Sequence, residues 1–226
     1  GKGDNKSSTN SLSSYEESDV STKGLVSSLT GIVNAFMDMT KSPKTEPVDS
    51  FTSQMERTQA SIATPPTTPE ELLERIRDDY VLENYLWTGN IYLPAFEETC
   101  TFTDPTLSFQ GRDKFVSNVQ NLRPIVDRLI TNKEDGCKSE LLDIKLNTEN
   151  SYVETRWNMI GDLEALPWQP RIDVIGRTKF WFRCSEQEYS KSKGYQVYLY
   201  DECWEIPAGK ALLQLVTPRG TISNQP

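Results

Sequence analysis

The stretch "CTFTDPTLSFQGRDKF", Cys100 to Phe115, decides the fold of this chain. Its first residues alternate as in a β-strand, and Asp104-Pro105 then ends the pattern, because proline offers no N–H to a strand ladder. A second short alternation follows, Gly111 provides a turn, and charged residues open an apolar helical pattern. A strand, a sharp break and a helix in such close succession predict a domain that mixes strands and helices, an α+β fold.

Composition limits the classes of function open to the protein. The chain has 226 residues, a net charge of -9 and a mean hydropathy of -0.57, which is low for a chain packed along its whole length. An acidic protein repels phosphate backbones, so nucleic-acid binding is disfavoured. No stretch approaches the roughly twenty apolar residues that span a bilayer, so no transmembrane segment is expected.

The absence of histidine removes several mechanisms. Ser-His-Asp and Cys-His nucleophile systems cannot form, and acid–base chemistry must use carboxylates, Tyr, Lys or Cys. Neither a metal site nor a cofactor is predicted, because zinc-ligand spacings are missing. Four widely spaced cysteines are expected to pack as small hydrophobes in a reducing compartment; they are Cys100, Cys137, Cys184 and Cys203.

Composition also divides the chain into three parts. Residues 1–68 are rich in Ser and Thr and predict a disordered extension, with a short amphipathic helix near 25–39 that docks on the domain or on a partner. Residues 69–218 are expected to form one domain, and residues 219–226 a flexible tail. Because the sequence starts at Gly1 without an initiator Met, we expect that an upstream targeting segment, such as a transit peptide, was removed or omitted.

The periodicity of the domain changes from helical to strand-like along the chain. Thr68 as cap and Pro69 in the first turn predict a helix that ends at Gly89, and a second helix follows Gly111, which Pro124 would kink or divide. From there on, the period is two. Five segments predict an antiparallel meander, with the helices on one face of a curved sheet: 139–148, 151–160, 171–184, 195–206 and 211–217.

This order of elements resembles the nuclear transport factor 2-like superfamily, which includes SnoaL-like cyclases and ketosteroid isomerase-like enzymes. The resemblance rests on the long first helix, on "CTFTDPTLSFQGRDKF" and on the closing "YLYDECWEI". The run "FTDPTLSFQG" is most similar to a plant and cyanobacterial chloroplast-type family. The resemblance implies a cone-shaped sheet wrapped around N-terminal helices, a pocket between them, and a location in the plastid stroma or at the thylakoid.

Alternation along the strands selects the predicted ligand pocket. It places Trp157 on the concave face of one strand and Phe180 and Phe182 on that of the next, where they either fill the core or form the walls of a pocket. Asp104 has two interpretations: its side chain accepts backbone N–H bonds in an Asx-turn, or it is a pocket carboxylate with a raised pKa that abstracts a proton. The predicted pocket therefore consists of Trp157, Phe180, Phe182 and Asp104.

The last hairpin supplies the other candidates for catalysis. Alternation puts Tyr198 on the same face as Tyr200, Glu202 and Trp204, and puts Asp201 on the opposite face. Tyr hydroxyls beside a carboxylate form an oxyanion hole or satisfy buried polar groups. The weak catalytic candidates are Asp104, Asp201 and Tyr198.

The outward face of the neighbouring strand carries Lys179, Trp181 and Arg183, which predict either a wet sheet surface or a site for a protein partner or a homodimer. We therefore expect a plastid protein that is a pocket for a small apolar molecule or an interaction module. The alternative is an isomerase or lyase that uses carboxylate and Tyr acid–base chemistry.

Overall fold

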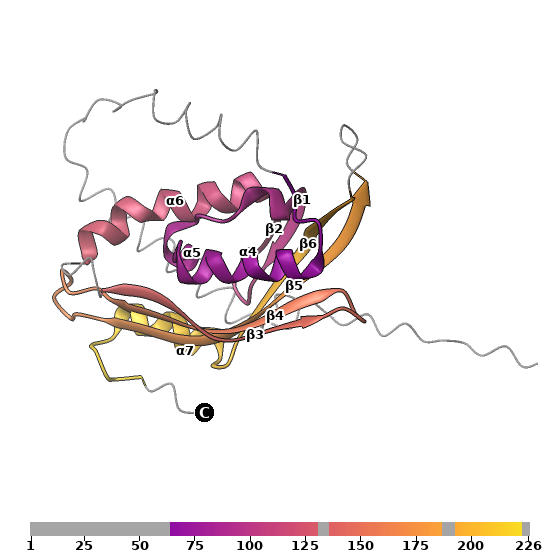
Figure 1. Cartoon of the computed structure of the whole chain (residues 1–226). Helices are drawn as coiled ribbons and strands as arrows, with labels where there is room; N and C mark the ends of the chain where they lie inside the picture. The colour runs from indigo at the N-terminus through magenta and orange to yellow at the C-terminus, as the bar shows by residue number, and fades with distance from the viewer. Residues whose placement is uncertain (1–63, 131–135, 187–192, 223–226) are drawn as a thin grey trace, which may run out of the picture.

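The computed structural model describes residues 64–130, 136–186 and 193–222 (Figure 1). The predicted disordered extension lies outside these residues except for 64–68, and so does its amphipathic helix near 25–39. Of the predicted flexible tail, residues 219–222 are described. No helix among the described residues is long and apolar enough to cross a membrane.

Six strands form one curved sheet in the order β2-β1-β6-β5-β4-β3. β3 to β6 are an antiparallel meander and β1 pairs antiparallel with β2, whereas β1 runs parallel to β6. The prediction of an antiparallel sheet therefore fails at one pair, because no hairpin joins β1 to β6 and fixes their direction. The strands are Phe96–Thr103 (β1), Ser108–Gln110 (β2), Cys137–Asn147 (β3), Tyr152–Asp162 (β4), Arg171–Glu186 (β5) and Lys193–Trp204 (β6).

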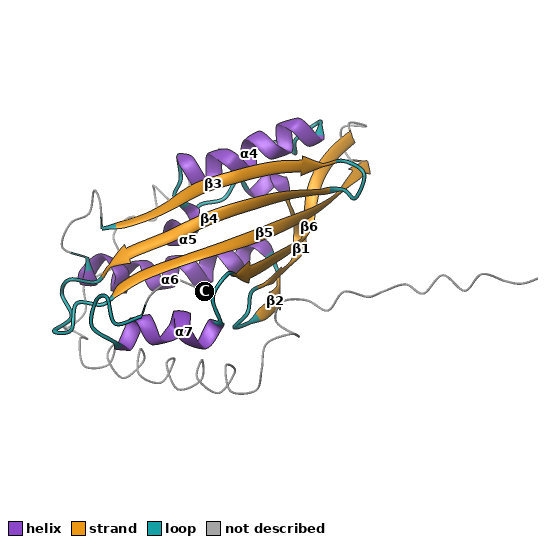
Figure 2. Cartoon of the chain, turned by 90° about the horizontal axis from the view of Figure 1, so that it is seen from below, coloured by secondary structure: helices purple, strands orange, loops and turns teal. Residues whose placement is uncertain are grey.

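The helices lie on both sides of this sheet. α4, α5 and α6 cover its concave face, and the short α7 lies on the opposite face (Figures 1 and 2). The predicted α+β architecture, a curved sheet wrapped around N-terminal helices, is confirmed. The helices span Pro69–Val81 (α4), Tyr85–Thr88 (α5), Arg112–Leu129 (α6) and Ala208–Leu213 (α7), with 3-10 turns at Leu93–Ala95 and Gln214–Val216.

The first helix begins as predicted but ends early. Thr68 caps α4, because its hydroxyl accepts a hydrogen bond from the backbone N–H of Glu71 at 3.1 Å. The helix stops at Val81, and Asn84 adopts a left-handed conformation with φ 52°. The Asn84 amide group donates to the Cys137 carbonyl at 3.1 Å, so β3 holds the break in place. The separate α5 then begins at Tyr85, which is buried.

The Asp-Pro break has the geometry of a turn. The Oδ1 atom of Asp104 accepts hydrogen bonds from the backbone N–H groups of Thr106 and Leu107 at 2.6 and 3.0 Å. The Thr106 hydroxyl donates to the same oxygen at 2.6 Å. Gly111, with φ 115°, then turns the chain into α6. The turn reverses the chain after β1, so that the next residues pair with β1 as the antiparallel strand β2. The helix α6 follows directly.

A bulge in β6 changes which side chains face the interior. Phe182 of β5 pairs with Val197, but Trp181 pairs with Leu199, so Tyr198 is an extra residue on β6. Tyr198 consequently stacks beneath the exposed Arg183, whose guanidinium lies 5.1 Å from the ring centre. The prediction that Tyr198 shares the face of Tyr200 and Glu202 is wrong, because alternation was counted through the bulge.

The last predicted strand, 211–217, is helical instead. Within it, the buried residues Ala211 and Gln214 are three apart, which is helical spacing. The Gln214 amide group pairs with β5 in place of a strand: its oxygen accepts from the Asp173 N–H at 2.9 Å, and its nitrogen donates to the Asp173 carbonyl at 3.0 Å. The Gln214 side chain thus forms hydrogen bonds with the backbone N–H and C=O groups of β5 at a point where β6 no longer pairs with it.

The cysteines depart in part from the prediction. Cys100 is buried in the core and Cys137 is half-buried, but Cys184 and Cys203 are exposed, and all four are free thiols. Cys203 lies on the outer side of the sheet because it alternates with the buried Glu202, whereas Cys184 lies near the end of β5. Only Cys100 therefore packs as a small hydrophobe within the main core.

Candidate functional site

An interior chamber lies between the helices and the concave face of the sheet. Apolar residues from α4, α6, β1 and β5 supply most of its walls, and tyrosines from α5 and β6 supply hydroxyl groups. No part of the space between its side chains admits a water molecule. The chamber is therefore closed by its own side chains; it is lined by Ile76, Asp79, Tyr85, Ile91, Phe96, Phe102, Phe115, Phe180 and Tyr200.

A chain of buried hydroxyl groups starts in this chamber and leads into the sheet. The Tyr85 hydroxyl donates to the Tyr80 oxygen at 3.0 Å and lies 3.2 Å from the Tyr200 oxygen. Tyr80 in turn contacts the Thr155 hydroxyl at 2.9 Å. At the other end, the Tyr200 hydroxyl donates to Glu202 Oε2. Three tyrosines from three elements thus join the Glu202 carboxyl to the centre of the sheet.

The Glu202 carboxyl has an unusual affinity for protons. Its second oxygen accepts a hydrogen bond from the Trp204 indole N–H at 2.7 Å. The pKa of Glu202 is raised from 4.5 to about 7, chiefly by burial and in addition by the neighbouring Asp104 carboxylate, whereas the hydrogen bonds from Tyr200 and Trp204 act to lower it. Burial likewise raises the pKa values of Tyr85 and Tyr200, so both tyrosines keep their protons.

A second carboxyl group borders the chamber from α4. Asp79 is only 4% exposed, and its Oδ1 atom accepts a hydrogen bond from the Tyr92 backbone N–H at 2.9 Å. Burial raises the pKa of Asp79 well above its ordinary value, and the nearby carboxylates of Asp78 and Glu83 add to this effect. Asp79 is thus a buried acid at the wall of an apolar chamber.

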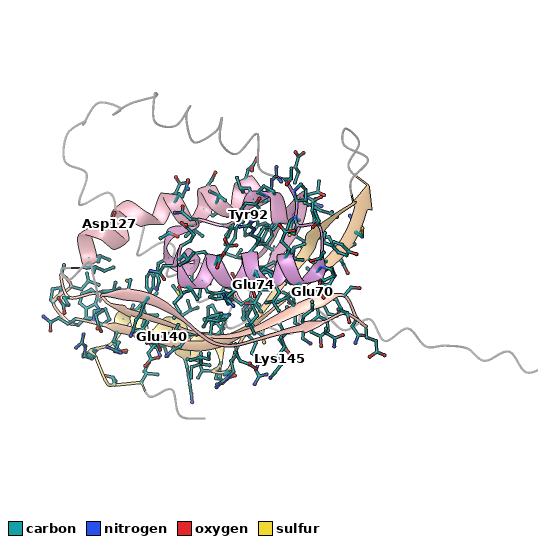
Figure 3. The ribbon with its side chains drawn as sticks, in the orientation of Figure 1. Glu70, Glu74, Tyr92, Asp127, Glu140 and Lys145 are labelled. Carbon is teal, nitrogen blue, oxygen red and sulfur yellow. The ribbon has the colours of Figure 1, made fainter. Side chains whose placement is uncertain are left out.

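A surface groove of about 300 Å³ adjoins the chamber, and Asp79 and Ile91 line both. Tyr92 forms another wall, with the Arg75 guanidinium 4.7 Å from its ring centre; Figure 3 shows Tyr92 beside α4 on the helix side of the sheet. The groove is open to solvent, unlike the chamber. Ile91 and Asp79 therefore separate solvent from the chamber; the remaining lining residues are Asp78, Leu82, Glu83 and Asn90.

The structure brings one of the predicted pocket walls into the chamber. Phe180 lines it, whereas Trp157 and Phe182 are not among the lining residues. Trp157 is 1% exposed and donates its indole N–H to the Thr178 hydroxyl at 2.9 Å. A Cβ atom at Gly176 would lie 2.4 Å from the Trp157 ring, so the indole fills the space above a glycine on the next strand.

The predicted catalytic candidates are not brought together. The Asp104 carboxyl is engaged in its own turn, as the Asx-turn interpretation requires. Burial raises its pKa, but it does not line the chamber. Asp201 is half-buried and alternates with the inward-facing Tyr200 and Glu202, and Tyr198 faces outward beneath Arg183.

The outer-face residues are engaged with their own neighbours. The Lys179 ammonium lies 5.2 Å from the centre of the Tyr152 ring, which also packs against Trp181 at 5.0 Å between ring centres. The Arg183 guanidinium pairs with the Glu97 carboxylate through bonds of 2.5 and 2.6 Å. This arrangement fits the interpretation of a wet sheet surface.

Sequence reasoning missed the residues that α4 and α5 contribute. None of Asp79, Tyr80 and Tyr85 is among the site residues predicted from the sequence, and the predicted helix runs on past Tyr85 to Gly89. One signal was available: Asn84 tolerates a left-handed conformation, so a break before Tyr85 could have been considered.

Comparisons with known proteins place this chain in context. Residues 70–190, more than half of the chain, match the model of a family described as "Uncharacterized conserved protein (DUF2358)". No curated protein sequence matches the chain.

Several solved structures are similar to it at low identity. A hypothetical protein from Catenulispora acidiphila DSM 44928 with a ketosteroid isomerase-like fold, solved with trimethylamine, is 15% identical at a TM-score of 0.39, over 69% of this chain and 96% of its own. A protein from Xanthomonas campestris pv. campestris, assigned as a polyketide cyclase, is 16% identical at a TM-score of 0.42, over 66% of this chain and 99% of its own. A protein from Jannaschia sp. CCS1, assigned as a SnoaL-like polyketide cyclase, is 11% identical at a TM-score of 0.39, over 70% of this chain and 93% of its own.

Proposed function

The chain belongs to the DUF2358 family, and we propose that it binds a small, largely apolar molecule in the chamber between α4–α6 and the sheet. The observation that supports this most directly is the composition of the chamber wall. Apolar and aromatic side chains surround two tyrosine hydroxyls and one carboxyl, Asp79. Ligand sites commonly combine apolar walls with a few polar groups that fix orientation.

The ligand must enter by displacing side chains, because the chamber admits no water in its closed state. Ile91 is the apolar residue that faces both the chamber and the solvent-filled groove. It is only half-buried and belongs to the irregular segment between α5 and β1, where side chains move more readily than in a sheet. The groove beside Tyr92 is therefore the route of access, with Ile91 as the residue that gives way.

Native mass spectrometry of the full chain tests this proposal. We expect a bound metabolite to be recovered with the wild-type protein and to be lost when Ile91→Trp blocks the passage. Leu82→Trp is the matched control: Leu82 lines the groove but not the chamber and is 72% exposed, so this change should leave the metabolite in place. Retention of the metabolite by Ile91→Trp would place it elsewhere on the protein.

A second candidate function is proton transfer, as in an isomerase or lyase. Asp79 favours it, because a buried carboxyl with a raised pKa shares a chamber with two tyrosine hydroxyls. The recovered metabolite incubated with protein in deuterated water would then exchange a carbon-bound hydrogen, and Asp79→Asn would stop the exchange. An absence of exchange in the wild-type protein leaves binding as the function.

We also propose a location in the plastid, at the stroma or the thylakoid surface. The proposal is supported by the similarity of "FTDPTLSFQG" to a chloroplast-type family. A fluorescent fusion of the full precursor should accumulate in plastids. Fluorescence confined to the cytosol or the nucleus would contradict the proposal.

A further inference from the structure

The buried hydroxyl chain is one hydrogen short when Glu202 is ionised. Three contacts connect Tyr80, Tyr85, Tyr200 and Glu202 in sequence. The Tyr85 hydrogen is directed to Tyr80, so only the Tyr200 hydrogen remains for the other two contacts. If Tyr200 donates to the Glu202 carboxylate, no hydrogen lies between the Tyr85 and Tyr200 oxygens, which are 3.2 Å apart.

A proton on Glu202 removes this deficit. A carboxylic acid at Glu202 can donate to Tyr200, which then donates to Tyr85, and Tyr85 to Tyr80. The Trp204 indole continues to donate to the other carboxyl oxygen. Every contact then holds one hydrogen. Without that proton, two oxygen lone pairs face each other in a medium of low dielectric constant, which is costly.

We propose that the chamber selects ligands that carry a hydrogen-bond donor. When Glu202 is ionised, the ligand shares its hydrogen with the Tyr85 and Tyr200 oxygens; when Glu202 is neutral, the Tyr200 hydrogen takes that place. This inference rests on the proposed function of the chamber and names the chemical class of its ligand, an apolar molecule with one hydroxyl or N–H group. In both protonation states the two tyrosine hydrogens are already used. A carbonyl or enolate oxygen on the ligand therefore finds no free donor.

The surroundings of Glu202 support a proton that is held but exchangeable. On β6, Asp201, Tyr200 and Trp204 are its neighbours, and Thr178 of β5 is opposite it. Asp104, after β1, is the carboxylate that affects Glu202 most, and Asp201 acts in the same direction. From α4 and α5, the hydroxyls of Tyr80 and Tyr85 complete the set. The pKa of about 7 means that both protonation states are populated near neutral pH.

Three small probes of similar size separate the possibilities: phenol has a hydrogen-bond donor, acetophenone has only an acceptor, and toluene has neither. They are titrated by calorimetry into the full chain carrying Phe115→Ala. Phe115 lines the chamber and packs within 6.0 Å of Tyr200 and 6.4 Å of Tyr85 between ring centres, so its truncation opens space beside both hydroxyls. Phe115→Leu serves in its place if the alanine variant does not fold.

We expect phenol to bind about tenfold more tightly than toluene, and acetophenone no more tightly than toluene. The advantage of phenol should grow from pH 6 to pH 8, because ionisation of Glu202 opens the position that phenol fills. Adding Glu202→Gln should abolish this growth, since the Gln amide donates permanently to Tyr200. The inference would be overturned if acetophenone bound more tightly than phenol, or if the advantage of phenol grew equally with pH in the Gln variant. Either result would leave the proposal of a binding pocket intact. Failure of all three probes to bind would overturn the pocket itself.

Discussion

Replacing Trp157 by alanine is expected to lower the free energy of unfolding by about 3–5 kcal/mol, the range for an aromatic side chain deleted from a core. Trp157 is 1% exposed, and its ring lies against Gly176, where even a Cβ atom would be only 2.4 Å away. The change also leaves the Thr178 hydroxyl without the indole N–H that it accepts at 2.9 Å. Urea denaturation of the full chain measures the loss.

Trp181→Ala is the matched control, because Trp181 lies on the outer face of β5, half-buried against Tyr152. It should cost about 1 kcal/mol. Equal losses for the two variants would show that Trp157 does not fill a closed core. If Trp157→Ala loses little unfolding free energy but no longer retains the bound metabolite, Trp157 forms a wall of the ligand pocket instead.

The free energy of unfolding should fall by about 3 kcal/mol as the pH rises from 4.5 to 7, because of Glu202. Its pKa is about 7 in the folded protein and 4.5 when unfolded. Between these values the unfolded state releases its proton while the folded state keeps it, so the unfolded state binds fewer protons and stability declines with pH. Below 4.5 and above about 7 the contribution is constant.

Glu202→Gln isolates this effect, since it keeps the shape but cannot titrate; its amide oxygen accepts from Trp204 and its amide nitrogen donates to Tyr200, as neutral Glu202 does. The burial-raised pKa values of Asp79 and Asp104 act in the same direction, and both groups remain in the variant, so the difference between the two stability curves reports Glu202 alone. Glu205→Gln is the control: its pKa is lowered by hydrogen bonds from Arg156, so its contribution is lost below pH 4.5 instead. Parallel curves for wild type and Glu202→Gln would contradict the assignment.

The fold was largely predictable because its signals are local. Thr68, the Asp-Pro turn and the alternation in β4 and β5 each act over a few residues, and the structure confirms them. The errors have non-local causes. The parallel pairing of β1 with β6 is set by packing, and the helix at Ala208–Leu213 forms where Gln214 completes the edge of β5.

The site was less predictable, since it depends on two backbone irregularities. The left-handed Asn84 separates Tyr85 from α4, and the bulge at Tyr198 decides that Tyr200 and Glu202, but not Tyr198, point inward. Alternation along the sequence correctly predicts the hairpin that carries these residues, but it cannot predict where a bulge interrupts a strand. Asp79 gives no signal in the sequence, because charged residues on a helix usually face solvent.

The carbon-13 chemical shift of the Glu202 carboxyl tests the central claim most directly. In the full chain labelled at the glutamate side-chain carboxyl carbon, the signal that disappears in Glu202→Gln identifies this residue. The account predicts that its shift titrates with a midpoint near pH 7, as a buried acid joined to the tyrosine chain must. A midpoint near the ordinary value of 4.5 would show that Glu202 is ionised in the folded protein at neutral pH and would contradict the account.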